Sequence, residues 1–402
     1  MVRSLGTHPK VAIVGGSAAG LFTAYLLARA GREAQVFEGQ ENFDGAPRSL
    51  IVTHRMREVL GGLGEKAVVN EIRRFELFTD GRVAKIELRR PDLIIERNLL
   101  IRELAAAARA AGASIEFGQK FLSLDQDNHA LTLTMERSKG GDADSAKFRT
   151  VIGADGAVSR VAKAAGLPKP STVPLVQAIV NLPPGMAPDT VRVWFIPEDT
   201  PYFYWLIPHS ATQGVVGLIG EDGAATKAVL ERFLDKHRLT PVSYQGARIP
   251  IYTGWVPVRR ELAGGDVYLV GDAAGHVKVS TVGGIVTGFR GALGVVDAIL
   301  NGGSSGKLRA LRRELDAHLL VRKLIHGFTQ THYSNLVDLL NARVRKDLEA
   351  HTRDEPVGVL WRLCIHQPRF LLVGLRALLS GASFPDHHRP PDAIVDSPNK
   401  RA

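Results

Sequence analysis

The chain has 402 residues, of which 45% are hydrophobic and 23% are charged, a composition typical of a globular protein and not of a disordered or fibrous one. Its single cysteine, Cys364, excludes an internal disulfide, an iron–sulfur cluster and a zinc site built on several thiolates, so we expect no metal site. The net charge of +10 predicts attraction to an anionic partner, but the basic residues are spread along the chain, so we do not expect that partner to be nucleic acid.

Two sequence features bear on the location of the protein. No basic region followed by an apolar core precedes the first expected strand, so we expect no secretory signal, and the apolar stretch at 370–379 is broken by Arg376. That stretch is much shorter than the ~20 residues that a membrane-spanning helix needs. We expect a cytoplasmic location, either free in solution with a solubilising basic surface or at the periphery of a membrane through transient contacts.

The first expected elements form half of a dinucleotide-binding fold: a buried strand at 10–14, an apolar helix at 21–30 and a second strand at 34–37. The turn between the first strand and the helix reads Gly15, Gly16, Ser17, Ala18, Ala19 and Gly20. Its first glycine permits a tight bend, its last lets helix and strand pack closely, and the helix N-terminus offers backbone N–H groups to a pyrophosphate. Ser17 stands where the middle glycine is usual.

An acidic residue strengthens this interpretation of the turn. Glu38 closes the second strand eighteen residues after Gly20, where a carboxylate accepts hydrogen bonds from ribose hydroxyls. Alone, the turn would equally fit a glycine-rich strand-to-helix connection that binds nothing. Together, the turn and Glu38 predict a nucleotide site.

The following elements alternate between the first domain and a second one. In chain order we expect a helix at 98–111, strands at 114–117 and 121–124, a hairpin at 131–149 and a strand at 151–152. From about 168 to 257 the pattern changes to short β-like segments separated by Pro and Gly, which predicts a sheet-based domain. A strand at 267–270 indicates a return to the first domain, and the pattern from about 308 to 381 is helical.

Three further segments indicate which nucleotide is bound. Arg97, followed by Leu100 and Leu104, resembles an element of FAD-dependent proteins whose arginine approaches the ribityl and pyrophosphate part of the cofactor. The strand-end segment from Gly271 through Asp272 resembles the Gly-Asp motif of the same class, in which the aspartate binds the ribityl chain. Gly283, Gly284 and Ile285 then open a helix whose positive end can face the N1–C2=O side of a flavin. These segments predict FAD.

We therefore expect an α/β fold in which a Rossmann-like FAD-binding domain of the glutathione-reductase-like class is interleaved with a β-sheet substrate domain and followed by C-terminal helices. The expected parts are an FAD-binding domain at 8–168 that resumes at 258–305, a β-rich substrate domain at 169–257 with part of 45–96, a helical region at 306–384 and a disordered tail at 385–402.

The segment from Gly271 to Lys278, continued by Gly283 to Ile285, resembles the geranylgeranyl reductase family, which reduces double bonds of polyprenyl chains with FAD. The order Phe203, Trp205, Ile207 and Pro208 is similar to the motif that lines the lipid cavity of those reductases, although it also fits a strand with a buried tryptophan. The resemblance implies that Phe203, Trp205 and Ile207 contact a hydrophobic or lipid substrate.

The motifs and the resemblance together give the candidate cofactor-binding residues, which are Gly15, Ser17, Ala18, Ala19, Gly20, Glu38, Arg48, Ser49, Arg97, Phe121, Asp155, Gly271, Asp272, Gly283, Gly284 and Ile285. The chain departs from the family at three places: Ser49 replaces a common cysteine, and Val279 and Val282 replace an expected Pro and Gly. No catalytic residue is assigned, since His276 could donate a proton near the flavin but a loop histidine is more often structural.

Three functions remain open at this point. The first is reduction of C=C bonds of a geranylgeranyl lipid by hydride transfer from reduced FAD. No second dinucleotide motif for NADPH is present, so we expect an external electron donor, which is NADPH bound transiently, ferredoxin or a flavin reductase. The second is a monooxygenase or halogenase, favoured by the hydroxylase-like Asp155–Gly156 element and by Ser49; Lys66 and Lys85 are candidate halogen carriers because they lie in the first domain, although both also fit surface lysines. The third is a non-catalytic prenyl-lipid carrier, against which Arg97 and Asp272 argue.

Overall fold

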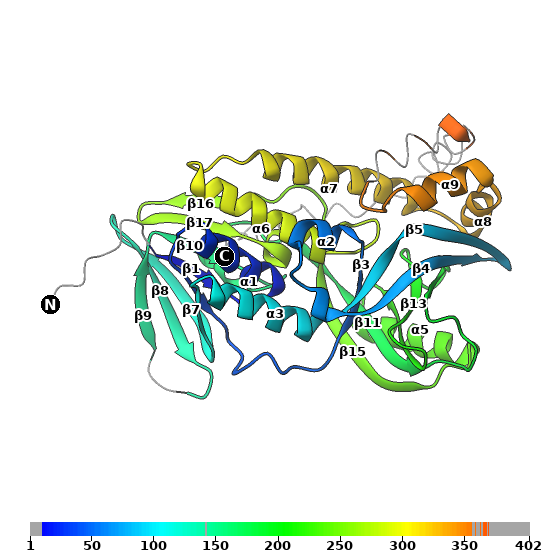
Figure 1. The fold of residues 1–402 in the computed structure, drawn as a ribbon, viewed down its shortest axis with the longest axis horizontal. Coiled ribbons are helices and arrows are strands. Elements are labelled where there is room, and N and C mark those ends of the chain that lie inside the picture. The colour runs from blue at the N-terminus through cyan, green and yellow to red at the C-terminus, as the bar shows by residue number, and fades with distance from the viewer. Residues whose placement is uncertain are drawn as a thin grey trace, which may run out of the picture.

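The computed structural model describes residues 10–140 and 143–355, together with 358, 362, 365–367 and 369. Its first sheet has six strands in the order β16-β17-β10-β1-β2-β6 (Figure 1). Five of them are parallel, and β16 pairs antiparallel with β17. The bounds are β1 Val11–Val14, β2 Ala34–Phe37, β6 Ser114–Glu116, β10 Thr150–Gly153, β16 Arg259–Leu262 and β17 Gly265–Leu269.

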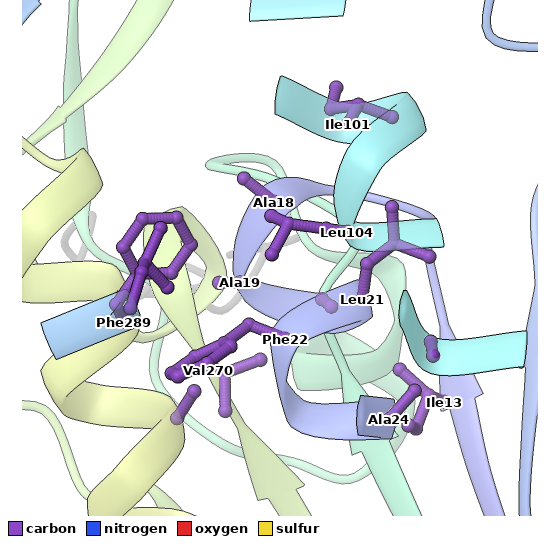
Figure 2. Packing of buried hydrophobic residues seen from close by; sticks show 14 of the residues in the cluster. Ile13, Ala18, Ala19, Leu21, Phe22, Ala24, Ile101, Leu104, Val270 and Phe289 are labelled. Carbon is purple, nitrogen blue, oxygen red and sulfur yellow. The ribbon is translucent and has the colours of Figure 1, made fainter. Parts of the chain in front are cut away.

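Alternate side chains of the parallel strands pack into two different cores. In β1, Val11 and Ile13 face the helices α1 (Ala18–Arg29), α3 (Arg97–Ala110) and α6 (Ile285–Leu300), as Figure 2 shows for Ile13. Ala12 and Val14 face the opposite core, which includes the three-stranded sheet of β7 (Gln119–Gln126), β8 (Leu131–Arg137) and β9 (Asp144–Phe148). A parallel sheet covered on both faces is the arrangement that nucleotide-binding domains require.

The second sheet has eight strands in the order β15-β11-β14-β13-β12-β4-β5-β3 and is antiparallel except between β12 and β4. Its bounds are β3 Ser49–Val52, β4 Val68–Thr79, β5 Arg82–Glu96, β11 Ser171–Asn181, β12 Thr190–Trp194, β13 Tyr204–Pro208, β14 Gln213–Ile219 and β15 Pro241–Ile251. Because the chain leaves the first sheet after β2 and again after β10, the two sheets are interleaved in sequence. The expected fold class is thus confirmed, and the residue boundaries of the domains stay predictions.

One helix was not expected from the sequence. The stretch expected to be only β-like contains α5 (Gly223–Lys236), which Asp222 caps by accepting a hydrogen bond from Ala225 N–H at 2.8 Å. Its Leu230, Phe233 and Leu234 cover one face of the second sheet. The helical region after the first domain is divided into α7 (Gly306–Ile325), α8 (Gln330–Asp338) and α9 (Ala342–Ala350). Residues 385–402 and most of 356–384 lie outside the described residues.

The remaining short helices are α2 (Arg55–Leu60), α4 (Arg160–Ala164) and the 3₁₀ turns η1 (Glu65–Ala67) and η2 (Gly271–Ala274). Figure 1 shows α7 reaching from α6 to α8 and α9, which lie beside β4 and β5. Across the described residues, a search for a helix long and apolar enough to span a membrane found none. Since α7 reaches from α6 to α8 and α9, it links the helices beside the first sheet to those beside the second sheet.

Candidate functional site

The turn between β1 and α1 leaves no room for side chains at two of its glycines. Gly15 has φ +106°, and a Cβ atom there would lie 2.5 Å from the carbonyl oxygen of Ala154. A Cβ on Gly20 would collide with the carbonyl oxygen of Gly15. Ser17 is the N-cap of α1, and its Oγ accepts a hydrogen bond from Gly20 N–H at 3.2 Å. The serine at the middle position thus has a structural role, and the other N–H groups of the first turn remain available to a phosphate.

Glu38 holds the same turn from the end of β2. Its Oε2 accepts a hydrogen bond from Gly16 N–H at 2.6 Å, and its Oε1 accepts one from Gln40 N–H at 2.8 Å. An ionised carboxylate has about four acceptor positions, so two backbone donors leave room for ribose hydroxyls. The acid and the glycine turn, predicted separately, therefore form one structural unit.

Three charged residues lie together beyond this turn. The carboxylate of Asp272 has no hydrogen-bond partner in the described part of the chain. The surrounding protein raises the pKa of Asp272 by burial, while the charges of Arg97 and Arg48 act in the opposite direction. The Nε of Arg48 is buried without a partner, and Arg97 N–H donates to the Arg48 carbonyl at 2.9 Å. The free hydrogen-bond acceptor on Asp272 and the free donor on Arg48 fit the ribityl chain and pyrophosphate of FAD.

The segment from Lys278 to Gly284 connects this group to the start of α6. Val282 N–H donates to the Lys278 carbonyl at 2.7 Å, and Lys278 N–H donates to the Gly283 carbonyl at 3.2 Å, so the loop closes on itself. Val282 has φ +53°, a left-handed conformation that a β-branched residue adopts only at a cost. The family resemblance predicts a glycine at position 282. Val282 has the left-handed backbone conformation that suits such a glycine.

Gly284 ties the loop to Asp272. A Cβ atom on Gly284 would lie 3.3 Å from Asp272 Oδ1 and 3.1 Å from a Val277 methyl group. The small residue therefore lets Asp272 lie close to the N-terminus of α6, where the helix dipole favours negative charge.

A cavity of about 750 Å³ is lined in part by Gly283 and Gly284. One end is lined by Arg48, Ser49, Gly283, Gly284 and Ile285, and the wall continues along the second sheet and α7. All three candidate substrate residues, Phe203, Trp205 and Ile207, line the same cavity. The structure thus brings the flavin-end residues and the substrate residues to one space, whose size is typical of a ligand pocket.

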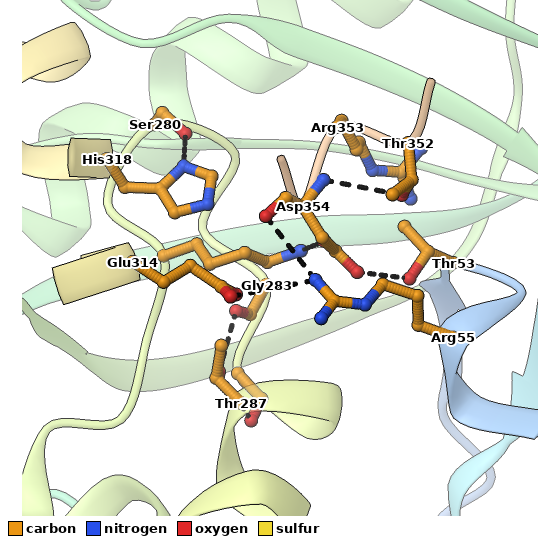
Figure 3. Close-up of polar contacts among 12 residues, drawn as sticks. Thr53, Arg55, Ser280, Gly283, Thr287, Glu314, His318, Thr352, Arg353 and Asp354 are labelled. Carbon is orange, nitrogen blue, oxygen red and sulfur yellow. Dashed lines mark hydrogen bonds and ion pairs between the residues drawn. The ribbon is translucent and has the colours of Figure 1, made fainter. Parts of the chain in front are cut away.

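One wall of the cavity is polar and was not predicted from the sequence (Figure 3). The ammonium of Lys278 forms an ion pair with Asp354, which also accepts a hydrogen bond from Thr53; all three residues are buried. Ser280 Oγ and His318 Nδ1 are 2.6 Å apart in the same wall. Burial would raise the pKa of Asp354, but Lys278 and the hydrogen bond from Thr53 outweigh it and lower the pKa to about 2.

Two candidate cofactor residues have side chains that serve the fold. The carboxylate of Asp155 accepts hydrogen bonds from Arg160 N–H at 2.7 Å, Val161 N–H at 3.0 Å and Ser159 Oγ at 2.6 Å, and so caps α4. The Phe121 ring is buried in the core beneath the parallel sheet. Contacts of either residue with FAD stay predictions. Because both side chains are engaged in the fold, such contacts would come from the backbone.

The basic side chains considered for catalysis lie elsewhere. His276 is fully buried, its ring centroid is 5.7 Å from that of Trp255, and it is not among the residues that line the cavity. Burial lowers the pKa of His276 to about 3. Lys66 and Lys85 are exposed and do not line the cavity either, and Lys85 forms an ion pair with Glu76 at 3.5 Å. The structure therefore provides no halogen carrier at these two lysines.

Comparison with known proteins identifies the framework. The model of the FAD binding domain family matches residues 8–301. The chain belongs to this family. The predicted cofactor, FAD, is thereby confirmed, and the protein is an FAD-dependent oxidoreductase. The glycine turn, Glu38, Arg48 and Asp272 described above are consistent with this cofactor.

Individual relatives confirm the resemblance inferred from the motifs. Digeranylgeranylglycerophospholipid reductase 2 of Methanopyrus kandleri is 27% identical over 299 residues, which cover 69% of this chain and 73% of the relative. The fold is similar to that of a geranylgeranyl bacteriochlorophyll reductase-like protein of Thermoplasma acidophilum, with a TM-score of 0.75, 17% identity and coverage of 92% and 99% of the two chains. A flavin-dependent halogenase also shares the fold, with a TM-score of 0.67, 16% identity and coverage of 92% and 78%.

Proposed function

We propose that the protein reduces C=C bonds of a geranylgeranyl-type prenyl lipid. The observation that carries this proposal is the continuous cavity that starts at Gly283 and Gly284 and runs along Phe203, Trp205 and Ile207. Bound flavin supplies a hydride in such a reduction. The name of the Methanopyrus kandleri relative, a reductase of a digeranylgeranyl phospholipid, supports the same substrate class.

An isolated C=C bond offers no polar group by which to orient it, so its position depends on the shape of the cavity. Phe203 and Trp205 form an edge-to-face pair with ring centroids 6.1 Å apart, and Ile207 is buried beside them. These side chains hold a hydrocarbon against the Gly283–Gly284 end and exclude water from it. Proximity and dryness are the contributions that this wall makes to catalysis.

The second hydrogen enters as a proton, and the polar wall can deliver it. Lys278 lines the cavity, and its Nζ lies 3.4 Å from the position of a Cβ atom built on Gly283. Burial lowers the pKa of Lys278, although Asp354 acts in the opposite direction. We propose the ammonium of Lys278 as the proton source at this end of the cavity.

The remaining partners follow from the substrate and the chemistry. A prenyl lipid resides in membranes, so we propose a cytoplasmic protein that contacts a membrane surface transiently, which its net charge of +10 favours. Electrons come from NADPH without a dedicated second nucleotide domain, or from ferredoxin or a flavin reductase.

The alternative function is oxygen-dependent hydroxylation or halogenation of a hydrophobic or aromatic substrate. One observation favours it: Ser49, which lines the cavity at the flavin end, occupies the position where the reductases commonly carry cysteine. The shared fold with a halogenase is compatible with either chemistry.

Product mass separates the two functions. Dithionite-reduced protein is incubated with a digeranylgeranyl phospholipid, once without oxygen and once in air, and the lipid is examined by mass spectrometry. A gain of two hydrogens per double bond without oxygen supports the reductase. Products that contain oxygen or halogen, and only in air, support the alternative and contradict our proposal.

A further inference from the structure

Arg322 on α7 is a buried cation without an acidic partner. It is 0% exposed, and its Nε and Nη1 have no hydrogen-bond partner in the described residues. Its Nη2 donates to the Pro201 carbonyl at 2.5 Å and lies 3.3 Å from His326 Nδ1, and its guanidinium carbon lies 4.6 Å from the centroid of the Tyr202 ring. Arg322 lines the cavity.

A lone buried charge is unusual because removing it from water is costly unless an opposite charge compensates. Stacking on Tyr202 offsets part of this cost. Three other arginines of the cavity have carboxylate partners within 4 Å: Arg55 has Glu314, Arg90 has Glu58 and Arg353 has Asp92, whereas Arg48 at the flavin end has none. Arg322 lacks such a partner among the described residues, so two of its guanidinium nitrogens, Nε and Nη1, are left without a protein acceptor.

Two phenol groups accompany this charge. Tyr202 and Tyr333 line the same cavity, each is 5% exposed, and neither hydroxyl has a hydrogen bond in the described part of the chain. Burial raises the pKa of Tyr202 to about 12 and also raises that of Tyr333, so both remain O–H donors at neutral pH. Arg322 interacts electrostatically with both phenols. A fixed positive charge with two free O–H donors is the donor set that recognises a phosphate or a carboxylate.

We propose that Arg322, Tyr202 and Tyr333 form a subsite for the anionic end, a phosphate or a carboxylate, of an amphiphilic substrate. This inference rests on the proposed function only for the prenyl nature of the chain that follows the anion. Arg322 lies one helical turn, about 6 Å, beyond His318, which contacts Ser280 in the loop before Gly283. Phe203, Gly283 and Gly284 line the same cavity as Arg322. The anion subsite thus shares one space with the hydrocarbon wall and the flavin end.

Saturated ligands test the subsite independently of reduction. Decyl phosphate, decanoate and decanol are titrated into the FAD-loaded protein below their aggregation concentrations and followed by calorimetry. We expect at least one of the anions to bind 10-fold or more tightly than decanol, and comparison of the two anions distinguishes phosphate from carboxylate. Arg322→Met should weaken the preferred anion roughly 10- to 100-fold, as loss of a charged hydrogen bond predicts, and leave decanol within about twofold.

Matched variants keep the result interpretable. Arg313→Met changes an exposed arginine of the same helix and should leave all three affinities unchanged. If Arg322→Met does not fold by circular dichroism, Tyr333→Phe takes its place, with an expected loss of about 3- to 10-fold for the anion alone. Equal binding of anion and alcohol by the unaltered protein, or equal loss of both in the variant, overturns the subsite. Anion selectivity without any prenyl reduction leaves the subsite standing and contradicts the proposed function.

Discussion

The buried ion pair between Lys278 and Asp354 gives the sharpest prediction about stability. Asp354 follows α9 and is 1% exposed, whereas Lys278 lies in the loop that leads to Gly283 and is 4% exposed. Asp354→Asn keeps the size of the side chain but leaves the ammonium buried without a counter-charge. Because breaking a buried pair on one side typically costs 3–5 kcal/mol, we expect the free energy of unfolding to fall by about 4 kcal/mol.

Urea unfolding at pH 7 measures this change, and a double-mutant cycle isolates the pair. Lys278→Met with Asp354→Leu removes both charges, so the double variant should recover most of the lost stability. Single variants that each lose less than 1 kcal/mol, or effects that simply add, would refute the argument that the two charges depend on each other.

The same pair sets a pH dependence. The pKa of Asp354 is lowered from 3.8 to about 2 in the folded protein. Its contribution to stability is therefore fully present above about pH 4 and is lost as the pH falls from about 4 to about 2. Asp354→Asn should remove this part of the acid destabilisation, and parallel unfolding curves of both proteins across that range check it.

Substitutions at four further positions test the cofactor end. Asp272→Asn should weaken FAD binding about 10-fold or more in a fluorescence titration, because the carboxylate is free for a ligand. Asp155→Asn should leave the affinity for FAD unchanged in the same titration. In urea unfolding it should lower the stability by about 1 kcal/mol, because it weakens the cap of α4. Val282→Gly should be about 1 kcal/mol more stable than Val282→Ala, because both lose the valine packing and only glycine relieves φ +53°; equal stabilities would show that this backbone is not strained. Gly20→Ala should prevent FAD retention on a desalting column, since its Cβ has no space; a fully yellow variant would contradict the geometry of the turn.

The cofactor end was predictable because its signals are local. The glycine turn, Glu38 and the strand-to-helix order occur within thirty residues, and each has a backbone reason that the structure displays at Gly15 and Gly20. Ser17 weakened the motif in the sequence, and its capping of α1 explains why the turn still forms. Helix α5 was missed because its amphipathic pattern lies within a segment of strands and turn residues.

The polar wall and the anion subsite could not be predicted because their members are distant in sequence. Lys278 and Asp354 are 76 residues apart, and no pattern around Asp354 marks it as a partner. Arg322 looks like any arginine of a charged helix until the fold shows that it lines the cavity and has no acidic partner in the described part of the chain. Such roles depend on burial, which arises only from tertiary packing.

The central claim is that the cavity presents an isolated C=C bond to the flavin. The most direct test is the rate at which dithionite-reduced protein, freed of excess reductant and oxygen, becomes reoxidised when a digeranylgeranyl phospholipid is added, recorded by the return of flavin absorbance. We predict reoxidation by this lipid and none by its fully saturated counterpart. Flavin that stays reduced with both lipids and reoxidises only when oxygen is admitted would contradict the account.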